Sequence, residues 1–85
     1  MSYFIKQYRG FEKDFERLED LMQLRILNVL ERLRVNPFYN IKHLKDVKTG
    51  VYCARIGDYR LRFDIFPQEK EIFLYRVRHR REVYR

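Results

Sequence analysis

The sequence predicts an α+β fold in which two helices cover one face of a four-stranded antiparallel sheet. Two observations predict it. Apolar residues recur at helical spacing between residues 11 and 35, whereas strand-like segments separated by short turns fill the chain after residue 50. An aromatic segment precedes the helices, so the expected order is one strand, two helices and three strands. A chain of 85 residues is expected to form one domain, residues 1–85.

The first half of the chain is expected to form a strand and a helical hairpin. Residues 3–8 are rich in aromatic side chains, as in strands, and Gly10 is expected to end this segment. From Phe11 the apolar residues follow at mostly three- and four-residue steps with acids between them. A second helical pattern continues to Leu33 and is ended by Asn36-Pro37. Two amphipathic helices with almost no spacer predict a hairpin.

The second half predicts a long connection and a three-stranded meander. The connection covers residues 37–50, and connections of this length are usually functional or loosely ordered. Strands are expected at residues 51–56, 59–66 and 71–78. Only residues 57–58 and 67–70 separate them, and such short turns join antiparallel neighbours.

Strand alternation assigns faces to these segments. Leu61, Phe63 and Ile65 are expected to face the helices, together with Ala54 and Ile56. In the last strand the expected core-facing residues are Phe73, Tyr75 and Val77.

The opposite, open face is then expected to carry arginines from three strands. They are Arg55, Arg60, Arg62, Arg76 and Arg78, with Arg80 just beyond the last strand. The net charge is +7, and residues 76–85 hold five arginines and one glutamate. A single arginine on a sheet face is usually only solvated, and its surface ion pairs are weak. The convergence of several favours phosphate binding, because the guanidinium fork matches phosphate oxygens.

The remaining residue types favour phosphate chemistry without a metal. His43, His79 and Cys53 lack the spacing of metal ligands, and the three glycines are isolated rather than clustered in a phosphate loop. RNA supplies its own nucleophile, the 2′-hydroxyl. Cleavage then needs a base, cations for the developing charge and an acid. Arginine supplies only the cations, because it stays protonated.

Proton transfer therefore requires other side chains near the arginines. The candidates are His79, Tyr84, Glu82, Lys45 and Lys48. Neighbouring cations lower the pKa of a tyrosine such as Tyr84. Two other interpretations stay open for Tyr84, which are stacking on a base and packing of the tail against the sheet. Alternation places His79 with Val77, which favours a histidine at the edge of the core.

The composition also indicates where the protein works. One cysteine excludes an internal disulfide and favours a reducing compartment. No segment approaches the roughly 20 apolar residues of a membrane span, and the N-terminus lacks the apolar core of a secretory signal. A cytosolic protein without a membrane partner is expected.

Two segments of the sequence resemble the RelE toxins of the RelE/ParE superfamily. The first is Tyr-Cys-Ala-Arg-Ile-Gly-Asp-Tyr-Arg, residues 52–60, and the second is His-Arg-Arg-Glu-Val-Tyr, residues 79–84. The expected order of elements agrees along essentially the whole chain. The resemblance implies a toxin of a type II toxin–antitoxin pair, which cuts mRNA in the ribosomal A site without a metal or cofactor. Its implied partners are the ribosome with its mRNA, a RelB-type antitoxin and, through the antitoxin, operator DNA.

The resemblance also implies roles for individual residues. The family's catalytic residues fall on Arg55, Arg60, Arg80 and Tyr84, with His79 and Lys45 as further candidates for proton transfer. Contacts to RNA are expected from Arg62, Arg76, Arg78, Arg81 and Lys48. Cys53 departs from the pattern, because some RelE toxins carry a lysine at this place, which can act as a base. The proton acceptor is then expected among His79, Tyr84 and Lys45.

Two other functions compete with the nuclease. A ParE-like toxin poisons DNA gyrase through protein contacts and cuts nothing, and it shares the same fold. A basic module that binds RNA or an acidic antitoxin without catalysis is the third. The arginines and tyrosine that follow the last strand favour the nuclease.

Overall fold

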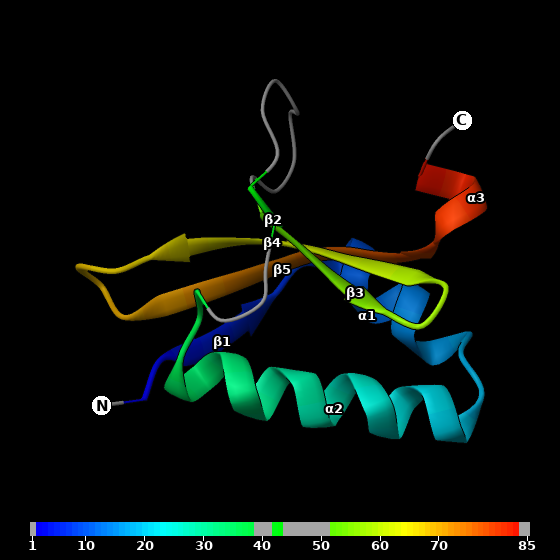
Figure 1. Cartoon of the computed structure of the whole chain (residues 1–85), viewed down its shortest axis with the longest axis horizontal. Helices are drawn as coiled ribbons and strands as arrows, with labels where there is room; N and C mark the ends of the chain where they lie inside the picture. The colour runs from blue at the N-terminus through cyan, green and yellow to red at the C-terminus, as the bar shows by residue number, and fades with distance from the viewer. Residues whose placement is uncertain (1, 39–41, 44–51, 84–85) are drawn as a thin grey trace.

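The expected fold class is confirmed by a computed structural model, which describes residues 2–38, 42–43 and 52–83. The elements are β1 (Phe4–Gln7), α1 (Arg9–Glu16), α2 (Asp20–Val35), β2 (Lys42–His43), β3 (Tyr52–Ile56), β4 (Tyr59–Phe66), β5 (Glu71–His79) and α3 (Arg80–Val83). The sheet order is β1-β5-β4-β3-β2, and α2 runs along one side of the sheet (Figure 1). None of the described helices is long and apolar enough to cross a membrane.

The sheet differs from the expected one at both edges. β1 pairs in parallel with β5, from Phe4 opposite Glu71 to Gln7 opposite Leu74, so the sheet is mixed. Inside the predicted connection, β2 adds a two-residue strand that pairs with β3. The pairing of β1 with β5 was not predictable from local sequence, because no short turn joins these two strands.

The structure gives Gly10 a different role from the one expected. Gly10 lies inside the first turn of α1, which begins at Arg9. A Cβ atom at Gly10 would lie 2.9 Å from Cδ of Arg76 and 3.3 Å from the carbonyl oxygen of Tyr75. The glycine therefore allows α1 to approach β5 closely instead of ending the strand before it. α2 ends at Val35, directly before Asn36-Pro37, as predicted.

The core lies between the sheet and the two helices. α1 contributes Phe11, and α2 contributes Ile26, Leu30 and Leu33. The buried strand residues include Ala54, Ile56, Leu61, Phe63 and Ile65, which confirms the faces expected for β3 and β4.

The face expected for the last strand is wrong over its first half. Ile72 and Leu74 are fully buried, whereas Phe73 and Tyr75 are only half-buried. The reason is a bulge: Arg62 pairs with Arg76 and Phe63 with Leu74, which leaves Tyr75 as an extra residue on β5. A bulge shifts the alternation by one residue, so the expectation holds again at Val77.

Candidate functional site

Cross-strand pairing gathers five arginines on the face of the sheet that lies away from the helices. Arg62 pairs with Arg76, and Arg60 pairs with Arg78. On the other side of β4, Arg55 also pairs with Arg60. Directly paired residues project from the same face of a sheet. The register therefore brings the predicted arginines together, and we call this surface the arginine face.

Arg60 lies at the centre of the arginine face. It is only 8% exposed, although its paired neighbours on both sides are arginines. Its Nη1 donates a long hydrogen bond of 3.5 Å to the carbonyl oxygen of Tyr59. Nε of Arg62 is also buried, and it has no hydrogen-bond partner among the described residues. Buried cations are costly without an anion, so this arrangement favours a bound phosphate.

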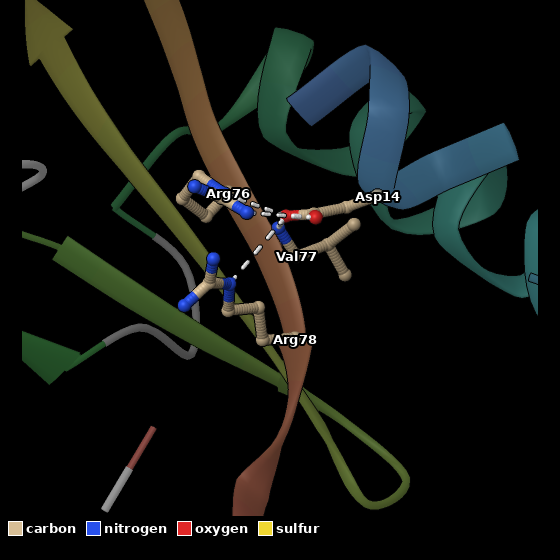
Figure 2. Close-up of polar contacts among 4 residues, drawn as sticks. All are labelled: Asp14, Arg76, Val77 and Arg78. Atoms are coloured by element: carbon tan, nitrogen blue, oxygen red, sulfur yellow. Dashed lines mark hydrogen bonds and ion pairs between the residues drawn. The ribbon is translucent and has the colours of Figure 1, made fainter. Parts of the chain in front are cut away.

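Asp14 on α1 reaches the edge of the arginine face (Figure 2). Its carboxylate accepts hydrogen bonds from Nε of Arg76 at 2.8 Å and from Nη2 of Arg76 at 3.0 Å. The backbone N–H of Val77 donates a third, of 3.1 Å. Nε of Arg78 lies 4.0 Å from the same carboxylate. Asp14 was not among the predicted site residues, because it lies 62 positions from Arg76 in the sequence and no local pattern links the two.

Three other predicted residues lie where β5 ends: His79 is its last residue, and Arg80 and Arg81 follow on α3. His79 pairs with Tyr59, whose ring it meets edge-on at 5.4 Å, and alternation gives it the side of Val77. Its Nδ1 accepts a hydrogen bond of 3.3 Å from the backbone N–H of Arg81. Arg80 and Arg81 are exposed on α3. The structure therefore does not bring His79 to the arginine face.

The structure describes the surroundings of Cys53 but not every predicted residue. Lys45, Lys48 and Tyr84 lie outside the described residues. Cys53 pairs with Arg62 on one side and with Lys42 on the other. A lysine position thus lies beside Cys53, which the sequence could not indicate because β2 was not predicted.

An aromatic cluster continues the same face beyond the bulge. The rings of Tyr8 and Tyr75 stack with their centroids 4.8 Å apart, and those of Tyr8 and Phe73 are 5.3 Å apart. Burial raises the pKa of the Tyr75 phenol above its usual value, and the nearby charge of Asp64 raises it further. Tyr75 therefore stays protonated at neutral pH and is a poor proton acceptor.

A groove lies between α1 and α2, apart from the arginine face. Its volume is about 390 Å³, and it is lined by Gln7, Phe11, Glu12, Phe15, Glu16, Leu27 and Leu30. The groove is mostly apolar, and Leu27 is 49% exposed. This combination is typical of surfaces that bind an amphipathic helix.

The fold is that of the RelE toxins. The chain is similar to the toxin in the RelBE2 complex of Mycobacterium tuberculosis, with 22% identity, a TM-score of 0.82 and coverage of 93% of this chain and 99% of the other. It is also similar to a chain of the RelE–RelB complex of Pyrococcus horikoshii, with 24% identity, a TM-score of 0.81 and coverage of 94% of this chain and 97% of the other. The isolated Escherichia coli RelE toxin is similar with 20% identity, a TM-score of 0.74 and coverage of 98% of this chain and 92% of the other. At these identities the likeness establishes the fold alone.

The family follows from the sequence. Residues 5–84 match the model of the ParE toxin of the type II toxin–antitoxin system parDE, and the chain therefore belongs to this family within the RelE/ParE superfamily. It is a toxin of the type II toxin–antitoxin class. No curated protein sequence matches it.

Proposed function

We propose that this toxin is an endoribonuclease that cuts mRNA in the ribosomal A site and so inhibits translation. The observation that carries the proposal is the arginine face, with Arg60 buried between Arg55 and Arg78. Fixed guanidinium groups match the oxygens of a phosphodiester, and they stabilise the charge that develops as it is attacked. The resemblance of residues 52–60 and 79–84 to the RelE toxins implies the same reaction, in which the substrate 2′-hydroxyl is the nucleophile and no metal is used.

The proposal divides the chemistry between two kinds of residue. Arg55, Arg60 and Arg80 stabilise the charge on the phosphate. Arg62 and Arg78, with Arg81 beyond the strand, bind neighbouring phosphates. Arginine cannot accept a proton at neutral pH, so the base and the acid come from other residues. Tyr84 and Lys45 remain the proposed groups for these steps.

Inhibition of DNA gyrase is the second candidate function. It is favoured by one observation, which is that the matching family model describes a ParE toxin. In that case the arginine face contacts protein, and no RNA is cut.

Mapping mRNA ends on translating ribosomes distinguishes the two functions. We expect induction of the toxin to produce cuts at codon spacing, and we expect these cuts to disappear in the double variant Arg80→Ala, Tyr84→Phe. Arg80 is exposed on α3 and does not belong to the core. Growth arrest with intact mRNA, together with loss of gyrase supercoiling activity in the purified system, would contradict the nuclease and support the ParE-like function.

We further propose that a RelB-type antitoxin places an amphipathic helix in the groove between α1 and α2. Phe11, Phe15 and Leu27 offer an apolar surface to such a helix. Glu12 and Glu16 on the same groove favour lysine or arginine beside its apolar stripe. The antitoxin, rather than the toxin, then contacts operator DNA.

The substitution Leu27→Glu tests this groove. We expect at least about a tenfold loss of affinity for a RelB-type antitoxin, because a charge replaces an apolar contact. Leu21→Glu is the matched control, because Leu21 is 67% exposed on the same helix and does not line the groove. Calorimetric titration of the purified proteins measures both. Equal affinities for the two variants would exclude the groove as the docking site.

A further inference from the structure

We propose that Asp14 is a positioning residue of the arginine face: it holds Arg76 away from substrate and fixes the place of Arg78 beside Arg60. The inference rests on the proposed nuclease and deepens it, because it distinguishes an arginine that anchors the site from those that bind phosphate. Asp14 touches neither substrate nor reacting atoms, and it acts through its two arginine neighbours.

The position of Asp14 follows from how the edge of the sheet is covered. β1 ends at Gln7, and the N–H of Tyr8 donates to the carbonyl oxygen of Leu74. Beyond this point α1 replaces β1 along β5. The carboxylate of Asp14 accepts the N–H of Val77 at 3.1 Å, which satisfies an edge group that β1 no longer covers. Asp14 is therefore fixed by the backbone of β5 as well as by its own helix.

The fixed carboxylate orients Arg76 strongly. Nε and Nη2 of Arg76 bind the two oxygens of Asp14 at 2.8 and 3.0 Å, in the bidentate geometry that suits a guanidinium. Gly10 leaves room for the stem of Arg76, since a Cβ atom there would lie 2.9 Å from its Cδ. The edge of Arg76 that is best suited to a phosphate is thus occupied by protein. Arg76 therefore anchors the arginine face. The sequence had instead predicted that Arg76 binds RNA.

Arg78 is held more loosely by the same carboxylate. Its Nε lies 4.0 Å from Oδ2 of Asp14, which is within the range of an ion pair. Arg78 pairs across the sheet with Arg60. The attraction between Asp14 and Arg78 (Figure 2) offsets part of the repulsion between the like charges of Arg78 and Arg60. Asp14 thus holds Arg78 in place beside Arg60 despite their like charges.

Asp14→Asn separates positioning from a purely structural role. Asparagine keeps an oxygen for the N–H of Val77 but loses the charge that holds Arg76 and Arg78. We expect kcat on programmed ribosomes to fall by about tenfold or more, because small misplacements of charged groups slow catalysis. Affinity for a single-stranded RNA protected by 2′-O-methyl groups should not fall. Its logarithmic dependence on salt should become steeper by about one unit, because a released guanidinium binds an additional phosphate.

Asp20→Asn is the matched control, because it makes the same chemical change at an exposed position of α2. We expect it to change neither kcat nor the salt dependence. If Asp14→Asn leaves both unchanged as well, Asp14 does not position the site. If kcat and RNA affinity fall together with thermal stability, its role is structural only, and the inference is overturned.

The role of Asp14 can still be tested if the Asp14→Asn variant does not fold or if the wild-type toxin cuts no mRNA. If the Asp14→Asn variant fails to fold, Arg76→Lys keeps the charge but loses the bidentate geometry, and the same fall in kcat is expected without loss of RNA affinity. If the wild-type toxin cuts no mRNA, the proposed nuclease fails. The comparison of salt dependence on protected RNA still decides whether Asp14 withholds an arginine from phosphate.

Discussion

Arg60→Ala is expected to lower the rate of mRNA cleavage by about 10²- to 10³-fold, the loss typical of removing one fixed group that stabilises transition-state charge. Arg60 is 8% exposed and lies between Arg55 and Arg78, so it is better fixed than an exposed arginine on α3. Its removal also relieves repulsion between like charges. We therefore expect the fold to survive. Single-turnover cleavage on programmed ribosomes and a thermal unfolding curve measure the two effects.

Two controls make the Arg60 result specific. Arg32→Ala removes the same charge from an exposed position on α2, and it should leave cleavage unchanged. Arg60→Lys keeps the charge but loses the planar fork, and it should recover only part of the rate. Full cleavage by Arg60→Ala would remove this residue from the reaction. Arg55 and Arg80 would then be the residues that stabilise the charge on the phosphate.

The arginine face was predictable because of where the bulge in β5 lies. In β4 the alternation of Leu61 and Phe63 with Arg60 and Arg62 is regular, and the structure keeps it. In β5 the predicted alternation is wrong up to and including Tyr75. The bulge at Tyr75 restores it, so Arg76 and Arg78 lie on the expected face although two of the three residues predicted to face the core in β5, Phe73 and Tyr75, do not. A sequence pattern assumes a continuous strand, and a bulge breaks that assumption.

Long-range partners were not predictable. The pairing of β1 with β5 and the contact of Asp14 with Arg76 join residues more than 60 positions apart, and each depends on how α1 packs. The sequence shows Asp14 only as one acid among several in an amphipathic helix. Its burial to 8% exposure makes it different from Glu12 and Glu16, and burial is a property of the folded chain.

Leu74→Ala is expected to lower the free energy of unfolding by about 2–5 kcal/mol, the cost of emptying a buried leucine site. Leu74 is completely buried, and it pairs with Phe63, which is also completely buried. Domains of this size are often only marginally stable, so a fall in Tm of roughly 10 °C or more is expected. Urea unfolding followed by circular dichroism measures the free energy directly.

Phe73→Ala gives the comparison that tests the bulge. Phenylalanine is larger than leucine, so side-chain size alone would make its removal at least as costly. Phe73 is only half-buried, and it meets Tyr8 and Phe66 on the open face. Its removal should therefore cost only roughly 1 kcal/mol, the scale of such aromatic contacts. The reverse order of the two losses would mean that β5 turns Phe73 inward, and the arginines after Tyr75 would then lie on the expected face without a bulge.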